Sequence, residues 1–120
     1  MKPRIDNTSF GSITIEGIVF DHDIFINLKG EVNKRKKKLS KKHFGTSHII
    51  SLEEAKHIYQ KGTEKLLIGS GQTGMVTLSD EASKFFDKKN CNVFIIPTGE
   101  AIERWNKETG SVIGLFHLTC

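Results

Sequence analysis

Residues 66–74 read Leu-Leu-Ile-Gly-Ser-Gly-Gln-Thr-Gly, an apolar run that ends in a glycine-rich loop. Residues 93–101 have the same form, with Val-Phe-Ile-Ile followed by Pro-Thr-Gly-Glu-Ala. Short apolar runs that end in such turns are typical of buried parallel strands. Ligands of open α/β sheets bind beyond the carboxyl ends of these strands. The two stretches therefore predict a parallel sheet and the edge at which a binding site would lie.

Helical and strand patterns alternate from residue 51 onward. The expected helices begin at residue 52 and at about residues 80 and 100, and the expected strands span 65–68, 92–96 and 111–118. Ser51, Ser79 and Thr98 each precede a helix and are its N-cap candidates, and Gly62 is expected to stop the first helix. Because strands joined through helices run parallel, this part of the chain predicts right-handed crossovers.

The first 30 residues predict an antiparallel meander instead. Strands are expected at 12–15, 18–20 and 24–28, with a tight turn at Glu16-Gly17 between the first two. Residues 44–50 predict a loop that leads into a short strand. The chain contains no internal repeat and no low-complexity linker, so we expect a single α/β domain over residues 1–120.

The net charge of +4 is concentrated in one segment. Residues 34–42 hold seven of the 18 basic residues and no acidic residue. A nucleic-acid-binding domain spreads its basic residues over a whole face, so this distribution argues against a nucleic-acid partner. We interpret the segment as a solvated loop or a lysine-protected edge strand. The functional alternative is a patch for phosphate, anionic lipid or an acidic protein surface. Its members are Lys34, Arg35, Lys36, Lys37, Lys38, Lys41 and Lys42.

Hydropathy and cysteine usage bear on the compartment. No apolar run is long enough to span a bilayer, and the first residues contain no stretch of signal-peptide length. Cys91 and Cys120 lack a C-x-x-C spacing, so a disulfide framework is not expected. These features predict a cytoplasmic protein that does not insert into a membrane.

The glycine-rich loop has the lettering G-x-G-x-x-G of a dinucleotide site. However, residues 75–78 look extended rather than helical, and no acidic residue ends the next strand. We therefore expect no cofactor, and interpret the loop as a tight turn with positive φ or as a nest of backbone N–H groups for an anion. If the two loops share one sheet edge, they form a small polar cleft. Its candidate ligand-binding residues are Gly69, Ser70, Gly71, Gln72, Thr98, Gly99 and Glu100.

Two further groups carry the residue types of metal or nucleophile chemistry. In Asp21-His22-Asp23 only the two aspartates would share one side of a strand, which makes a poor zinc site. His117 and Cys120 would face opposite ways on a strand, and we expect His117 to be buried and hydrogen-bonded. The sequence predicts no metal site and no catalytic residues, and it favours a protein that is not an enzyme.

The order of several short motifs resembles the Mth-type domain family. The motifs are Pro3-Arg4-Ile5-Asp6 with Phe10-Gly11, Gly17, Gly45-Thr46-Ser47-His48, residues 68–74, residues 97–101 with Trp105-Asn106, and residues 115–120. The family includes the adipogenesis-associated Mth-domain protein and mitochondrial complex I assembly factor three.

The resemblance implies a fold and a class of function. The fold is a compact three-layer α/β domain, with a mixed central β-sheet, helices and an additional antiparallel β-hairpin layer. The function is a non-enzymatic binding or assembly role through protein contacts. The alternative is a small-molecule site, for an anion, or an unidentified enzyme with its site at the Gly69–Gly74 and Thr98–Glu100 loops.

Overall fold

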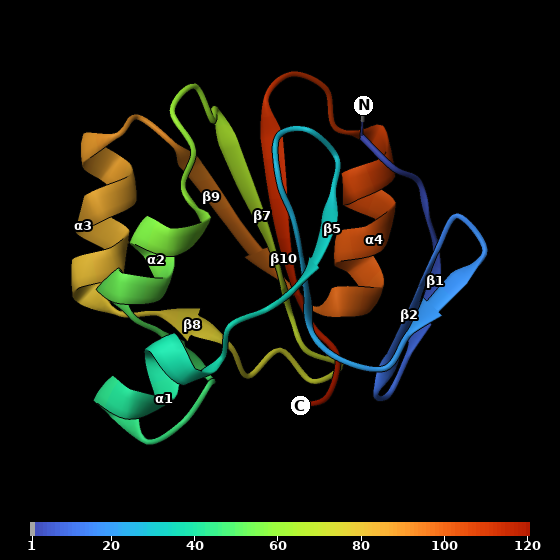
Figure 1. Cartoon of the computed structure of the whole chain (residues 1–120), viewed down its shortest axis with the longest axis horizontal. Helices are drawn as coiled ribbons and strands as arrows, with labels where there is room; N and C mark the ends of the chain where they lie inside the picture. Colours follow the sequence, from blue (N-terminus) through green and yellow to red (C-terminus); the bar gives the residue numbers. More distant parts are fainter. Residues whose placement is uncertain (1) are drawn as a thin grey trace.

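The computed structural model describes residues 2–120 and is built around a five-stranded mixed sheet (Figure 1). The strands lie in the order β5 (Val32–Lys34), β4 (Ile24–Ile26), β10 (Val112–His117), β7 (Lys65–Ser70) and β9 (Asn92–Ile96). The last three run parallel to one another, as the helical crossovers predict, whereas β4 is antiparallel to both of its neighbours, β10 and β5. The expected mixed α/β fold is confirmed.

Helices cover both faces of this sheet. The helices α2 (Leu52–Ile58) and α3 (Asp80–Lys88) pack on one face, where Ile58 and Phe86 meet Leu66 and Ile113. The helix α4 (Thr98–Lys107) packs on the other face, where the Trp105 ring lies edge-on to the Phe116 ring of β10. Burial of these apolar side chains is the main favourable contribution to folding.

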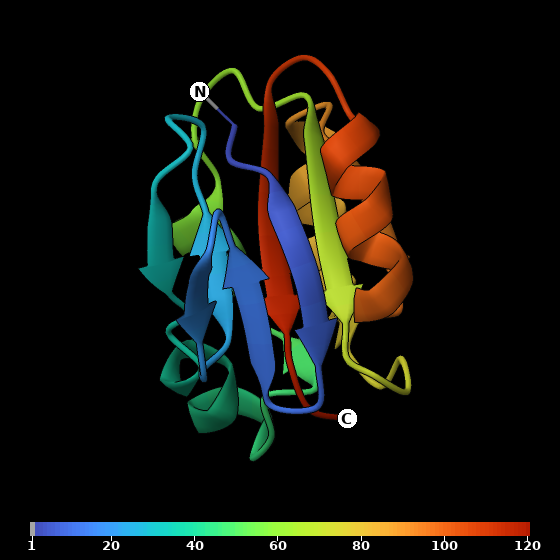
Figure 2. The same ribbon diagram turned by 90° about the vertical axis from the view of Figure 1, so that its right-hand side faces the viewer.

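A second, antiparallel sheet lies next to α4 (Figure 2). It contains β1 (Ile5–Ser9), β2 (Ser12–Ile15) and β3 (Ile18–Phe20). Glu16 and Gly17 both have positive φ, 48° and 80°, which confirms the predicted tight turn and fits its type I′ geometry. Ile13 and Ile15 alternate with more exposed residues and face the core shared with α4.

The remaining elements gather at the end of the sheet to which β7 and β10 point (Figures 1 and 2). They are the helix α1 (Lys38–Phe44) and the two short parallel strands β6 (Ile49–Ile50) and β8 (Thr77–Leu78). The carboxyl ends of the parallel strands, the lysine-rich segment and the C-terminal residues are therefore neighbours. Within residues 2–120, every helix is too short or too polar to cross a membrane.

Four local predictions were wrong. The strand β4 leaves the predicted meander and pairs with β10 and β5, because Ile24 and Ile26 are fully buried against α4 and the three-stranded sheet. Residues 38–44 form α1 rather than a loop, so only Lys34 lies on the expected edge strand. The helix α2 ends at Ile58, and its C-cap is Tyr59, whose backbone is extended, rather than Gly62. Thr98 is also not the N-cap of α4, since Pro97 occupies that position.

Candidate functional site: a buried charge cluster beneath lysines

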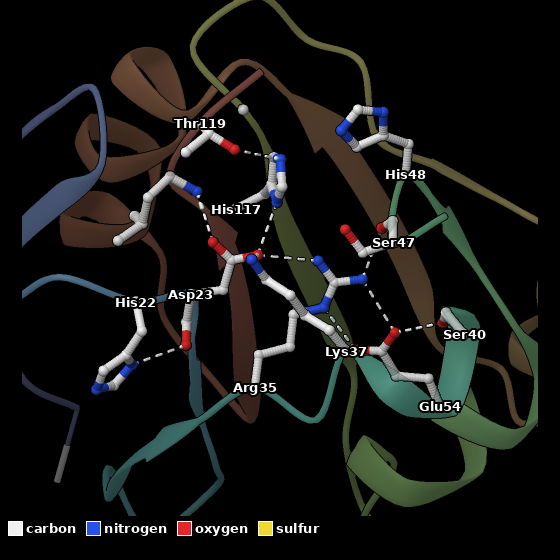
Figure 3. A network of polar contacts seen from close by, with 12 residues as sticks. His22, Asp23, Arg35, Lys37, Ser40, Ser47, His48, Glu54, His117 and Thr119 are labelled. Atoms are coloured by element: carbon white, nitrogen blue, oxygen red, sulfur yellow. Dashed lines mark hydrogen bonds and ion pairs between the residues drawn. The ribbon is translucent and has the colours of Figure 1, made fainter. Parts of the chain in front are cut away.

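The only arginine of the lysine-rich segment points into the protein (Figure 3). Arg35 is 4% exposed and donates from Nε and Nη2 to the two carboxylate oxygens of Glu54, at 2.7 and 3.0 Å. Its Nη1 donates to Asp23 Oδ2 at 3.0 Å, and Nη2 also reaches the Ser47 carbonyl at 2.9 Å. Burial opposes the charged guanidinium, but the hydrogen bonds and charges of Glu54 and Asp23 raise the pKa of Arg35 above its ordinary value.

Asp23 is the second centre of this cluster and lies just before β4. Its Oδ2 accepts from His117 Nδ1 at 2.6 Å and its Oδ1 accepts from the Leu118 N–H at 2.9 Å. The Lys37 ammonium lies 3.6 Å from Oδ2. Burial alone would raise the pKa of Asp23, but the hydrogen bond and charge of His117, together with the Leu118 N–H and Lys37, lower it to about 2. Asp23 is therefore ionised at neutral pH.

Glu54 links the cluster to α1 and α2. The Ser51 hydroxyl accepts from the Glu54 N–H at 3.1 Å, which confirms the predicted N-cap of α2. The Glu54 carboxylate does not complete a capping box, because it binds Arg35 and accepts from the Ser40 hydroxyl at 2.5 Å. Ser40 Oγ in turn accepts from the Ser51 N–H at 2.9 Å. Ser40 thereby fixes the start of α2 relative to α1, and Arg35 holds the Glu54 carboxylate in place.

His117 closes the cluster on the β10 side. As predicted, it is buried and hydrogen-bonded. Since Asp23 is ionised and only accepts, the His117 proton that faces it is on Nδ1. The other ring nitrogen, Nε2, lies 3.2 Å from Thr119 Oγ1, and the His48 ring stands edge-on at 5.3 Å between ring centres.

The cluster is complete in its hydrogen bonding. Within residues 2–120, every fully buried side-chain nitrogen or oxygen has a partner. The same residues contain no group of three or more His, Cys, Asp or Glu side chains arranged for a metal ion. The cluster thus acts as a clamp that holds the elements around it.

Six lysines of the segment remain at the surface above this clamp, and we call them the lysine surface. They are Lys34, Lys36, Lys37, Lys38, Lys41 and Lys42. Lys42 pairs with Glu53 at 2.8 Å and Lys37 lies against Asp23. The other four have no ion-pair partner within residues 2–120. Of the seven basic residues predicted as a patch, the structure therefore places six on the surface and Arg35 inside.

The two loops predicted as a cleft do meet at one sheet edge. The Gly71 N–H donates to the Thr98 hydroxyl at 2.9 Å, and the Thr98 N–H donates to the Gly71 carbonyl at 2.9 Å. The Thr98 hydroxyl donates in turn to the His117 carbonyl at 2.6 Å. Ser70 is buried, whereas Gly99 and Glu100 are exposed on the first turn of α4. The buried hydroxyl of Thr98 is therefore used inside the fold, where it ties β7, α4 and β10 together.

The backbone N–H groups of the glycine-rich loop also have partners in the chain itself. Thr73 and Met75 donate from their backbone N–H groups to the Cys120 oxygen, each at 3.2 Å, and the Thr73 hydroxyl donates to it at 2.7 Å. The Gln72 N–H donates to the Thr119 carbonyl at 2.7 Å. The backbone oxygen of Cys120 therefore occupies the position in the glycine-rich loop at which one interpretation of the sequence predicts a bound anion.

Comparison with known proteins identifies the family. The model of the family described as "Protein of unknown function (DUF498/DUF598)" matches residues 5–115. The chain belongs to this family. The family match, together with solved structures described as MT938 and as an Mth938-like domain, supports an Mth-type domain.

Two solved structures share 30% sequence identity or more with this Mth-type domain. The conserved hypothetical protein PH1505 from Pyrococcus horikoshii is 34% identical, with a TM-score of 0.89, and the alignment covers 98% of this chain and 99% of that one. A structure described as MT938 is 30% identical, with a TM-score of 0.82 and coverage of 99% and 100%.

A more distant structure agrees in fold alone. The Mth938-like domain, a protein from Bordetella pertussis, is 15% identical with a TM-score of 0.65 and coverage of 97% and 85%. These names describe an uncharacterised family of α/β domains and assign no activity.

Sequence reasoning missed the clamp itself. The sequence places Asp23 in a candidate metal motif and His117 in a candidate nucleophile pair, yet the two side chains bind each other across 94 positions of sequence. Arg35 was grouped with its lysine neighbours by charge. The available signal was its residue type, because a planar guanidinium is the group that satisfies two buried carboxylates at once.

Proposed function

We propose that this chain is a single-domain, non-enzymatic binding module that acts in the cytoplasm through protein contacts. Its lysine surface would bind an acidic surface of a partner protein, in the manner of an assembly factor. The resemblance to the adipogenesis-associated Mth-domain protein and to complex I assembly factor three supports an assembly-type role.

One observation carries this proposal. The Arg35 clamp holds the segment that bears the lysines, so the backbone positions of these lysines are set before any partner arrives. A surface whose charges are already positioned loses less conformational entropy on binding than a mobile tail does. Complementary charge also accelerates encounter and selects against basic partners.

The buried polar groups support a role in binding rather than in turnover. The hydrogen-bonding groups of Asp23, Glu54 and Arg35 are taken up by one another, by the side chains of His117 and Ser40, and by backbone groups. A general acid or base must reach a substrate proton within hydrogen-bonding distance. Carboxylates that already hold a buried arginine are poorly suited to that task.

The test compares two sets of lysine-to-glutamine substitutions of equal charge. One variant changes Lys36, Lys38, Lys41 and Lys42 of the lysine surface; the control changes Lys61, Lys84, Lys88 and Lys107, which lie elsewhere in the chain. The wild-type protein and both variants are immobilised, and the proteins retained from a native extract are quantified. We expect the first variant alone to lose its main acidic partner. Equal retention by the first variant and the wild type, or equal loss in both variants, would contradict the proposal.

A further inference from the structure

A hollow of about 640 Å³ lies beside the clamp, between the residues that precede β4 and the segment that begins at the end of β5. This volume is within the range of small-molecule sites. One wall is the segment Asp21–Asp23 and the other is the segment Lys34–Lys38. Lys41 and Lys42 do not line it.

The two walls are joined by the fold rather than by mobile side chains. The Arg35 N–H donates to the Asp23 carbonyl at 2.9 Å, and Ile24 is paired with Lys34 in the sheet. The Arg35 guanidinium adds its ion pair with Asp23 at 3.0 Å. The backbone that frames the hollow is therefore held in place before a ligand enters, so binding orders only the lysine side chains.

The charge that faces the hollow is positive. Five basic and two acidic side chains line it. The charge of Arg35 is taken up by Asp23 and Glu54, so the positive charge comes from four lysines, which outnumber Asp21 and Asp23. Lys34, Lys36 and Lys38 have no carboxylate partner within residues 2–120. Lys37 lies 3.6 Å from Asp23, beyond hydrogen-bonding distance, so its ammonium can still donate to a ligand.

The chemistry of these groups defines the ligand. Lysine ammonium groups are compact charges with three donors each, and they bind phosphate oxygens well. The hollow is larger than one phosphate needs, and a diphosphate offers more oxygens and more negative charge to its four lysines than a single phosphate does. We propose that this hollow binds the diphosphate group of a small phosphorylated molecule. The site uses part of the lysine surface, but it does not depend on a protein partner.

The experiment titrates the purified protein with inorganic pyrophosphate by isothermal calorimetry, at an ionic strength of about 0.15 M that screens weak surface attraction. The test variant is Lys36→Ala with Lys38→Ala, and the matched control is Lys41→Ala with Lys42→Ala. Both variants remove two lysines from the same segment, but only the first pair lines the hollow. We expect affinity to fall at least tenfold in the test variant and less than twofold in the control, since only the test variant loses charge-assisted hydrogen bonds to the ligand.

Amide chemical shifts of the wild-type protein give a second measurement that needs no variant. Pyrophosphate should shift residues 21–23 and 34–38 more than residues 41–44. Equal loss of affinity in the two variants, no binding by the wild type, or shifts spread along α1 would each overturn the proposal. Equal affinity for orthophosphate and pyrophosphate would overturn the diphosphate assignment. Because no partner protein is present, these results are independent of the pull-down outcome.

Discussion

Replacing Arg35 by lysine tests the clamp most directly. The substitution keeps the charge and removes only the shape of the guanidinium. Arg35 makes four side-chain hydrogen bonds, to both oxygens of Glu54, to Asp23 and to the Ser47 carbonyl. A lysine ammonium is a point donor and cannot bridge carboxylates on opposite sides of the site.

The expected cost follows from the groups that lose a partner. Both carboxylates are buried, Asp23 at 2% exposure and Glu54 at 0%. Asp23 would keep His117, the Leu118 N–H and Lys37, but Glu54 would keep only the Ser40 hydroxyl. Leaving buried Glu54 without a cationic partner costs about 3–5 kcal/mol, as for other buried ion pairs that are broken on one side. That loss is a large fraction of the total stability of an ordinary domain. The reverse exchange, Lys36→Arg, provides the control, since Lys36 is exposed and should change stability by less than about 0.5 kcal/mol.

The assay is urea unfolding, followed by tryptophan fluorescence and circular dichroism. Trp105 is buried in the core and reports the global transition. A fall in the midpoint at constant slope measures lost stability, whereas a changed slope signals loss of two-state behaviour. If Arg35→Lys costs less than about 1 kcal/mol, or no more than Lys36→Arg, the guanidinium geometry does not hold the segment and the argument for a preset lysine surface fails.

Three further predictions concern pH, a close contact and thiol reactivity. The pKa of Asp23 is lowered to about 2 from an ordinary 3.8, so ionised Asp23 stabilises the fold above pH 3.8 and this stabilisation is lost as the pH falls toward 2. Over that range the free energy of unfolding of the wild type, measured in urea, should fall by about 2 kcal/mol, and that of Asp23→Asn should not show this loss. Gly71→Ala should cost at least about 2 kcal/mol in the same assay, because φ is +105° and the new Cβ would lie 2.2 Å from the Cys120 carbonyl carbon, whereas Gly99→Ala has open space and should be neutral; equal costs would contradict this. Burial raises the pKa of the Cys91 thiol to about 11, so iodoacetamide should label exposed Cys120 first, and fast labelling of folded Cys91 would contradict its burial.

Local chemistry made much of the fold predictable. Ser51 and Ser79 cap their helices as expected, because a hydroxyl three residues before a free N–H is a local signal. The strands β7 and β9 were predicted from their apolar runs, and their parallel pairing followed from the intervening helix. The turn at Glu16-Gly17 was predicted in the same way from its two residues.

The remainder depends on contacts that are distant in sequence. The strand β4 has the same apolar pattern whether it pairs with β3 or with β10, and only the burial of both its faces decides between them. Thr98 stands where an N-cap would stand, yet its hydroxyl bonds Gly71 and His117. Sequence patterns relate residues that are a few positions apart. The hydrogen bonds of Thr98 to Gly71 and His117, and the Asp23–His117 pair, join more distant residues and so could not be derived from one sequence.

The basic residues of the lysine-rich segment have two roles, since Arg35 holds the segment to the fold and the lysines present positive charge at the surface. One arginine stands among six lysines, and burial separates them by residue type. A buried lysine in place of Arg35 would leave acceptors unsatisfied, whereas lysines at the surface keep their ammonium groups hydrated. The positive charge offered to a ligand therefore comes from the lysines alone, because the charge of Arg35 is used by Asp23 and Glu54. Asp23 and Glu54 hold the segment in place and also occupy the guanidinium of Arg35, so this group is not free to bind a ligand. We therefore expect ligands of this surface to be bound by lysine ammonium groups and not by a guanidinium.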